Sequence, residues 1–143
     1  MLILISSSML NAQVIHPKHY SIEDGLAGNH TYMCAQDAQG YIWIATTSGL
    51  SRFDGKSFKN FSITDKLLDN EILRVTVDHL DRVWLNSFSN HPSYSIVSSD
   101  TILNYKNTYW LSKLESDSKI KGEFVNKKDS ITYLFTPGLM YYM

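Results

Sequence analysis

Residues 20–45 read YSIEDGLAGNHTYMCAQDAQGYIWIA, and residues 61–86 read FSITDKLLDNEILRVTVDHLDRVWLN. The two stretches align without a gap at a shift of 41 residues, and seven of the 26 aligned positions are identical. Unrelated sequences of ordinary composition would agree at about one or two of them. A repeat of about 40 residues with aromatic, Asp and Gly landmarks is typical of the blades of a β-propeller. The repeat therefore predicts an all-β chain.

The alternation of side chains predicts four antiparallel strands in each repeat. In residues 72–77, the apolar side chains of Leu73, Val75 and Val77 recur with the period of two that marks a half-buried strand. Asp and Gly residues between the strands suit tight turns, because Asp caps its own backbone and Gly accepts a positive φ. The matching strand of the first repeat contains Tyr32, Cys34 and Gln36. The other strands expected in the two repeats are residues 41–45, 49–53, 56–63, 82–86, 94–97 and 101–105.

The N-terminal residues are expected to serve export and ring closure. Residues 1–13, MLILISSSMLNAQ, are interpreted as the end of a secretory signal peptide, because an apolar run precedes the small residue Ala12. Residues 14–23 contain the segment Tyr20 to Ile22, which aligns with the end of an outer strand of a blade. We expect this strand to complete the last blade of a full ring.

The repeat divides the rest of the chain into blades. Residues 24–63 are expected to form blade 1, and residues 64–106 are expected to form blade 2. Residues 107–143 are expected to form an incomplete blade 3, in which Thr132 stands where the other copies have a tryptophan. The predicted fold is thus a truncated, partial β-propeller of four-stranded antiparallel blades, about two and a half to three in number. The expected elements of blade 3 are a short helix or irregular connection at 107–115 and strands at 119–125, 130–136 and 137–141.

The composition of the chain excludes several classes of protein. The 143 residues carry a formal net charge of -1, and 43% of them are hydrophobic while 19% are charged. Such a chain is too apolar to be disordered, and it lacks the basic surface that a binder of the nucleic-acid backbone needs. The single cysteine, Cys34, excludes an intramolecular disulfide framework and a zinc site built on cysteines. The sequence contains no run of about 18 apolar residues that could cross a membrane as a helix.

The landmarks of the repeat resemble those of a known family, the two-component regulator propeller repeats. The family pattern runs approximately D-G-L-x-x-N and continues, after a strand, with D-x-x-G-x-I-W-I-x-T-x-x-G-L-x-R-Y-D-G. The second copy departs from this pattern at Lys66 and Asp81 and again beyond Leu85. The matching residues are Asp24, Gly25, Leu26, Asn29, Asp37, Gly40, Trp43, Gly49, Asp54 and Gly55 in the first copy and Asp65, Leu67, Asn70, Asp78 and Trp84 in the second.

The resemblance implies a role in signalling. Such propellers are usually the periplasmic sensors of membrane-bound histidine kinases, mostly in Bacteroidetes-like bacteria. There, a pair of propellers precedes a small β-sandwich, a transmembrane helix and the kinase module. The Asn70-Glu71 pair and the aberrant second repeat look more like the simpler kinases than like the hybrid ones. The chain would then perceive a signal, by ligand binding or domain rearrangement, without being an enzyme itself.

The resemblance also implies partners. These are the remaining blades and downstream domains of the same protein, a carbohydrate or other small-molecule ligand, and a second copy of the full-length kinase. No cofactor is expected, and the net charge of -1 argues against nucleic acid as a partner. A membrane would be contacted only through C-terminal parts of the full protein.

The residues that could bind a metal or catalyse a reaction are each explained better by a structural role. His16 and His19 are too few for a metal site, and Pro17 between them prevents helical spacing. Cys34 aligns with Val75, so we expect it to fill a core position rather than to act as a nucleophile with His30. The repeated aspartates and tryptophans are expected to serve turns and inter-blade packing rather than acid–base catalysis or sugar stacking. No catalytic residue and no metal ligand is therefore assigned.

A ligand site should use residues that differ between the copies and lie on loops at one end of the propeller. Two other functions remain open at this point, an exported propeller enzyme such as a polysaccharide lyase or glycosidase, and a non-catalytic scaffold of a few blades. The enzyme would need a cluster of carboxylates, or of His and Tyr, at the central channel. The residues that meet the condition for a ligand site are His30, Tyr32, Tyr41, Arg82, Asn90 and His91.

Overall fold

The computed structural model describes residues 17–88, 93–96, 101–104, 106, 122–126, 131–136 and 139–142. Each strand in these residues belongs to one of three antiparallel sheets, and the helices among them are two 3-10 turns of three residues each. None of the helices in the described residues is long and apolar enough to cross a membrane. The all-β prediction is confirmed. The predicted signal-peptide residues 1–13 and the predicted connection 107–115 lie outside the described residues.

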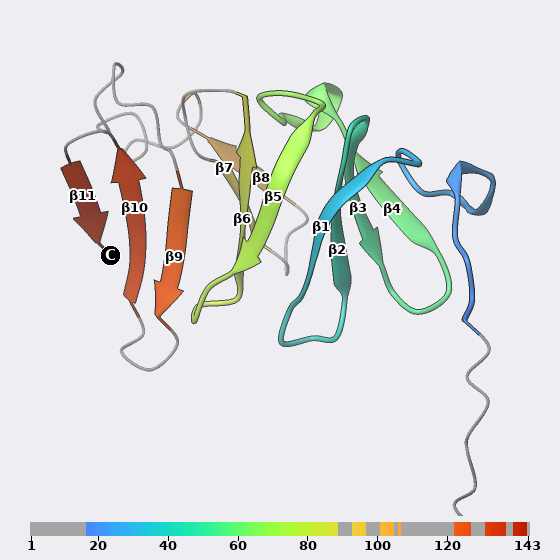
Figure 1. The fold of residues 1–143 in the computed structure, drawn as a ribbon, viewed down its shortest axis with the longest axis horizontal. Coiled ribbons are helices and arrows are strands. Elements are labelled where there is room, and N and C mark those ends of the chain that lie inside the picture. The colour runs from blue at the N-terminus through green and yellow to red at the C-terminus, as the bar shows by residue number, and fades with distance from the viewer. Residues whose placement is uncertain are drawn as a thin grey trace, which may run out of the picture.

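The first sheet is blade 1. Its strands are β1 (Thr31–Gln36), β2 (Ile42–Thr46), β3 (Gly49–Phe53) and β4 (Phe58–Phe61), which pair in this order (Figure 1). All three neighbouring pairs are antiparallel. Because the order across the sheet equals the order along the chain, the blade is a four-stranded meander of the kind that the repeat predicts.

The second sheet, blade 2, repeats this arrangement. Its strands are β5 (Ile72–Val77), β6 (Arg82–Ser87), β7 (Ser93–Ile96) and β8 (Thr101–Asn104), again paired in chain order. Each inner hairpin even carries the same irregularity, a register shift between Thr31 and Met33 in blade 1 and between Ile72 and Arg74 in blade 2. The two blades therefore share one backbone design.

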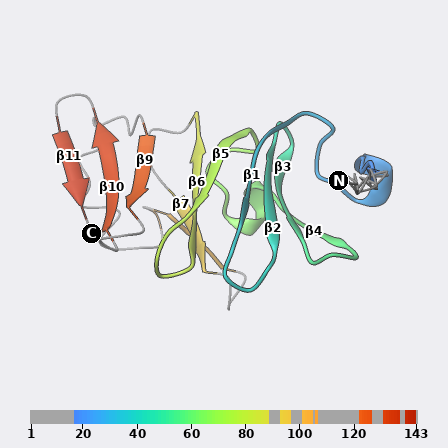
Figure 2. The ribbon, with the colours of Figure 1, turned by 60° about the horizontal axis from the view of Figure 1, so that its bottom comes forward.

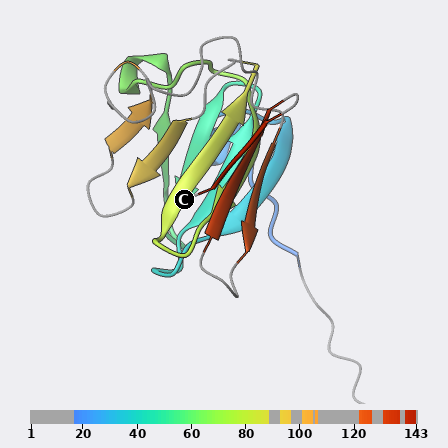
Figure 3. The ribbon, with the colours of Figure 1, turned by 90° about the vertical axis from the view of Figure 1, so that its left-hand side faces the viewer.

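A third sheet follows blade 2. It consists of β9 (Gly122–Asn126), β10 (Ile131–Thr136) and β11 (Leu139–Tyr142), paired in the order β11-β10-β9. Figures 1 and 2 show the three sheets side by side, and Figure 3, which looks along the row, shows them one behind another. This row of upright antiparallel sheets is the arrangement of blades in a partial β-propeller.

Two predicted strands differ from the structure. The outer strand predicted at 56–63 is the shorter β4, and the chain then enters a 3-10 turn, η2 (Ile63–Asp65). The segment Tyr20 to Ile22 was predicted as a strand, but residues 17–21 form no strand and the turn η1 (Ile22–Asp24) begins at Ile22. Each turn begins at a serine that forms a capping box with an aspartate three residues later, and this local bonding outweighs the apolar isoleucine that suggested a strand. That the residues before η1 complete another blade stays a prediction.

The core lies between blades 1 and 2. Blade 1 contributes its packed face, defined by the buried side chains of Trp43, Ala45, Leu50 and Phe61. The inner strand β5 of blade 2 lies against β1 and β2 of blade 1. Blade 2 contributes the apolar residues Val75, Val83, Leu85 and Ile102, which belong to the same buried cluster.

The opposite side of blade 1 has no such cover in the described residues. This open face is formed by Cys34, Ile42, Ile44, Phe53 and Phe58, which the strand register places on one side of the sheet. Cys34 is exposed, so the prediction that it fills a core position is wrong. Sequence alignment with Val75 correctly identifies the face of the strand, but Val75 is buried because blade 1 covers it, and the described residues place no sheet over Cys34.

Candidate functional site

The repeated aspartate and tryptophan of each blade are joined by a hydrogen bond. Trp43 donates from Nε1 to Oδ2 of Asp37 over 2.7 Å, and Trp84 donates to Oδ2 of Asp78 over 2.8 Å. All four residues are buried. Trp43 also stacks on Phe61, with 5.7 Å between ring centroids. Both indoles are therefore occupied by packing within the row of blades and offer no exposed platform to a sugar.

The same aspartates shape the turns that follow the inner strands. Oδ1 of Asp37 accepts hydrogen bonds from the backbone N–H groups of Gln39 and Tyr41. Oδ1 of Asp78 accepts in the same way from Leu80 and Arg82. Both carboxylate oxygens of each aspartate accept hydrogen bonds that stabilise the turn and the strands beside it. Because each blade contains the same turn, the aspartate recurs in each repeat.

Asp78 has one further partner that Asp37 lacks. The guanidinium Nε of Arg82 lies 2.6 Å from its Oδ2. Burial acts to raise the pKa of Asp78, but hydrogen bonds from Trp84 and Arg82, together with the charge of Arg82, outweigh burial and lower the pKa below its usual value. Arg82, a candidate ligand residue, is thus engaged in an internal ion pair.

Positive φ angles recur at matching positions even where glycine is replaced. Gly25 and Lys66 end the two 3-10 turns with φ of 101° and 73°. Gly40 and Asp81 close the two inner turns with φ of 90° and 59°. Asp81 adopts this unfavourable conformation while its Oδ1 accepts a hydrogen bond from the backbone N–H of Ala38 over 2.8 Å. The departure from the family pattern at Asp81 therefore adds a bond between the two blades.

The remaining landmarks also serve the backbone. Oδ1 of Asn29 accepts from the N–H of Ile22, and Oδ1 of Asn70 accepts from the N–H of Ile63. Leu26 and Leu67 follow the turns and are buried. The other landmarks with a capping or turn role are Asp24 and Asp65, which accept from the N–H groups of Ser21 and Ser62, and Asp54, which accepts from those of Lys56 and Ser57 before β4.

A shallow hollow of about 330 Å³ lies between the turns of blades 1 and 2. Acidic side chains lie around it, but the structure shows no group of three His, Cys, Asp or Glu residues that could hold a metal among the residues it describes. The carboxylates of Asp37, Asp78 and Asp81 each accept hydrogen bonds from the protein. We assign no site here. The lining residues are Gln36, Asp37, Ala38, Val77, Asp78, His79 and Asp81.

The candidate ligand residues do not form one site. His30 and Tyr32 lie where β1 begins, whereas Tyr41 precedes β2 at the other end of the same hairpin, as the pairing of Gln36 with Ile42 shows. Six residues of strand separate these ends by about 17–20 Å. Tyr41 lies under the guanidinium of Arg52, 4.4 Å from its ring centroid. Asn90 and His91 lie outside the described residues, as does His16.

Tyr32 makes a contact that the sequence did not indicate. Its hydroxyl donates a hydrogen bond to Oε1 of Glu71, which precedes β5 in the neighbouring blade. This hydrogen bond, some burial and the negative charge of Glu71 raise the pKa of Tyr32 above its usual value. The pair lies on the surface where the inner strands of the two blades meet, and 49% of Tyr32 is exposed. Neither residue is a repeat landmark, so the repeat alone could not identify this pair.

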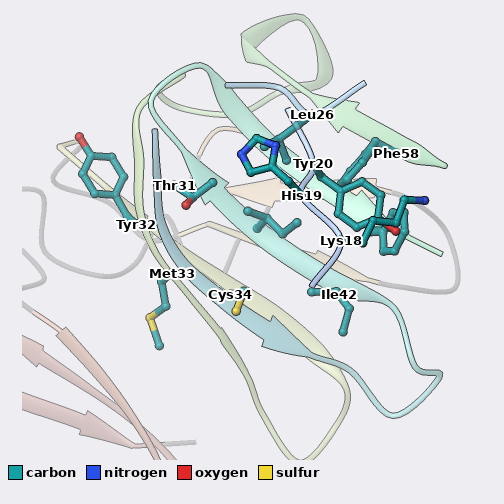
Figure 4. A pocket seen from close by; sticks show the side chains of 12 residues that line it. Lys18, His19, Tyr20, Leu26, Thr31, Tyr32, Met33, Cys34, Ile42 and Phe58 are labelled. Carbon is teal, nitrogen blue, oxygen red and sulfur yellow. The ribbon is translucent and has the colours of Figure 1, made fainter. Parts of the chain in front are cut away.

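An apolar groove of about 600 Å³ lies on the open face of blade 1 (Figure 4). Cys34 and Ile42 lie along its floor, and Tyr20 packs on one side with Phe58. The groove was not predicted from the sequence. The residues Cys34, Ile42 and Ile44 on the open face align with Val75, Val83 and Leu85, which are buried in blade 2. The lining residues are Lys18, His19, Tyr20, Leu26, Thr31, Tyr32, Met33, Cys34, Ile42, Ile44, Phe53 and Phe58.

Comparison with known proteins identifies the repeat. The family model of the two-component regulator propeller matches residues 25–48. No curated protein sequence matches the chain significantly. The matched residues contain the turn after η1, the strands β1 and β2, and the Asp37–Trp43 hydrogen bond that holds them together.

Solved structures show the same fold. Two crystal structures of the extracellular domain of BT4673 from B. thetaiotaomicron match the chain with a TM-score of 0.51. One describes BT4673 as a candidate one-component system and the other describes it as a candidate hybrid two-component system. Their sequence identities to the chain are 11% and 12%, and the match covers 82% of this chain and 23% of each of theirs. The chain thus spans about a quarter of the length of these relatives. The extracellular domain of the candidate hybrid two-component system BT3049 from the same organism matches with a TM-score of 0.41 at 16% identity, covering 88% of this chain and 25% of that one.

The repeat, the blade geometry and the comparisons agree. Two successive blades carry the same buried Asp–Trp pair, the same capped 3-10 turn and the same strand order. Residues 25–48 of this chain match the two-component regulator propeller repeat, and the chain folds as consecutive blades of a partial β-propeller.

Proposed function

We propose that this chain is the N-terminal part of the extracytoplasmic β-propeller sensor region of a two-component sensor histidine kinase. The observation that carries the proposal is the two-component regulator propeller repeat at residues 25–48. The fold shared with extracellular domains of the BT4673 type supports it. The chain would perceive a signal by binding a ligand or by a rearrangement of domains. A kinase module elsewhere in the protein would transmit the signal.

The chemistry of the described residues supports a binding role rather than an enzymatic one. The repeated carboxylates accept hydrogen bonds from backbone N–H groups and tryptophan side chains, so they stabilise the structure of the blades. The pair of Tyr32 and Glu71 lies where two blades meet and presents a hydroxyl and a carboxylate at the surface. A hydroxyl and a carboxylate can form hydrogen bonds with the hydroxyl groups of a carbohydrate. A shift of one blade against the other would change the hydrogen bond between Tyr32 and Glu71.

Two observations support an extracytoplasmic placement. The similar structures are extracellular domains. Residues 1–13 read as the end of a signal peptide. A fusion of alkaline phosphatase to the C-terminus of the chain tests this placement, because the phosphatase is active only after export. In a fusion that begins at the natural start of the gene, we expect activity in intact bacteria and its loss when residues 1–13 are deleted. Equal activity with and without residues 1–13 would contradict the export signal.

Sequencing the gene beyond the codon for Met143 tests the proposed function itself. We expect further propeller repeats, a β-sandwich, a transmembrane helix and a histidine kinase module in one reading frame. A stop codon soon after Met143, followed by an unrelated gene, would contradict the proposal. Catalytic clusters of a lyase or glycosidase in place of the kinase would favour the enzyme alternative.

A further inference from the structure

One buried asparagine of blade 2 holds the backbone of two lysines. Asn104, the last residue of β8, is only 3% exposed. Its Nδ2 donates a hydrogen bond to the carbonyl oxygen of Lys66 over 2.8 Å, and its Oδ1 accepts one from the backbone N–H of Lys106 over 2.9 Å. Because one side chain bonds to both backbones, it fixes the points from which the two lysine side chains start.

The two lysines line one small hollow beside the turn η2. Its volume is about 260 Å³, and both lysines are exposed there, whereas Leu67 is buried. None of the described residues that line it carries a negative charge. Two positive charges beside one hollow repel each other, and an anion between them replaces this repulsion with attraction. The lining residues are Ile63, Lys66, Leu67, Leu68, Asn104 and Lys106.

The backbone conformation of Lys66 is one that favours glycine. Its φ is 73°, in the left-handed region where a Cβ is strained, and the same position of blade 1 is occupied by Gly25 with a φ of 101°. Glycine would end the turn η2 without this strain, so the backbone does not account for a lysine here. The strain therefore points to a role for the side chain of Lys66.

Blade 1 contains the same asparagine without the lysines. Nδ2 of Asn60 donates to the carbonyl oxygen of Gly25 over 2.9 Å, as Asn104 does to Lys66. The residue two positions after Asn60 is Ser62, the N-cap of η2, whereas the residue two positions after Asn104 is Lys106. Both positions thus carry a lysine in blade 2 alone. They meet the condition for a ligand site, since they differ between the copies and lie outside the strands.

We propose that Lys66 and Lys106 form a binding site for a small organic anion. A carboxylate or sulfate group lies between the two ammonium groups, and its compact body lies against Ile63 and Leu68. Ligand pockets usually measure about 300–1,000 Å³, so a hollow slightly below this range suits a single ring rather than an oligomer. Hydrogen bonds between charged groups are stronger than neutral ones, so the site should prefer an anion to a neutral molecule of the same shape. The proposal does not rest on the proposed sensory function.

Titration with cyclohexanecarboxylate and with its neutral amide, cyclohexanecarboxamide, tests the site. The backbone amide signals of residues 66–68 and 106 are followed by NMR of the nitrogen-15-labelled chain at constant ionic strength. We expect these signals to shift with the carboxylate, and its dissociation constant to be at least about fivefold lower than that of the amide. Lys66→Gly and Lys106→Ser, which introduce the residues of blade 1, should each remove most of this preference. Lys56→Ser removes the same charge from an exposed turn of blade 1 and should keep the preference.

Thermal unfolding separates a loss of binding from a loss of folding. Lys66→Gly should melt at or above the temperature of the parent, because glycine removes the strain at the positive φ. Equal binding of carboxylate and amide by the parent would overturn the proposal, and so would a preference that persists in both lysine variants. Sedimentation with vesicles of phosphatidylcholine and phosphatidylglycerol that requires both lysines, without any binding of cyclohexanecarboxylate, would also overturn it, because the lysines would then contact a lipid surface.

Discussion

Trp43 and Asp37 form the buried hydrogen bond on which blade 1 is built. The indole Nε1 donates to Oδ2 over 2.7 Å, while the other carboxylate oxygen holds the turn between β1 and β2. The bond ties a side chain of the core to the turn that connects the two inner strands. Because Trp84 and Asp78 repeat it in blade 2, this pair explains why a tryptophan and an aspartate recur at a period of 41 residues.

Replacing Trp43 by Ala should lower the free energy of unfolding by about 3–5 kcal/mol, because a fully buried aromatic side chain leaves a cavity between the blades. Trp43→Phe should retain part of the packing but leave Oδ2 of Asp37 without its donor, at a cost of about 1–3 kcal/mol. Urea denaturation measures both values. Phe88→Ala is the control, since Phe88 is 67% exposed and its removal should change little. A loss below about 1 kcal/mol for Trp43→Ala would contradict the buried packing.

Asp78 should make stability depend on pH. Its pKa is lowered in the folded chain, so it adds stability while it is ionised in both states, above about pH 4. That contribution is lost as the pH falls below about 4 and the folded carboxylate takes up a proton. Asp78→Asn should therefore reduce stability at pH 7, and its difference from the parent should shrink below pH 4.

Urea titrations between pH 7 and pH 3 measure this difference. Glu23→Gln is the control, because it removes a carboxylate that is exposed at the surface of η1. A difference between parent and Asp78→Asn that stays constant down to pH 3 would show that the charge of Asp78 contributes nothing through its lowered pKa.

The repeat was sufficient to predict the blades, because strand alternation and turn residues are local properties of the sequence. It could not predict the environment of a residue, which depends on the neighbouring sheet. Cys34 and Val75 hold the same position in their strands, yet one is exposed and the other is fully buried. The alternation of side chains identifies the face of a strand, and only the row of blades shows what covers that face.

The candidate ligand residues were predicted less well for a related reason. Variation between copies selected Arg82 and Tyr41, but the structure shows Arg82 paired with Asp78 and Tyr41 under Arg52. Differences between repeats thus mark local adjustments of the interface as well as surface sites. The capped 3-10 turns were also missed. Their signal, a serine three residues before an aspartate, was present at Ser21 and Ser62.

Gly49 and Gly55 should respond differently to replacement by Ala. Both have a positive φ, 138° and 96°, so either alanine is strained by about 1–2 kcal/mol. A Cβ at Gly49 would also lie 2.5 Å from the carbonyl oxygen of Phe61, whereas one at Gly55 would meet nothing within 4 Å. We expect Gly49→Ala to cost roughly 2–4 kcal/mol in total, because backbone cannot move aside as a flexible side chain could. Thermal unfolding of the two variants compares them directly, and equal melting temperatures would contradict the close approach of β3 and β4.

The contact between Tyr32 and Glu71 should be visible in the ionisation of the tyrosine. Glu71 accepts the hydrogen bond of the neutral phenol and repels the phenolate, so the pKa of Tyr32 is raised. The absorbance of the parent minus that of Tyr32→Phe isolates this residue among the nine tyrosines. Glu71→Gln should move the isolated titration to lower pH, because the glutamine is neutral. Glu23→Gln, a substitution of an exposed acid in η1, should leave the titration of Tyr32 in place. An unchanged titration in Glu71→Gln would mean that the two blades do not meet through this pair.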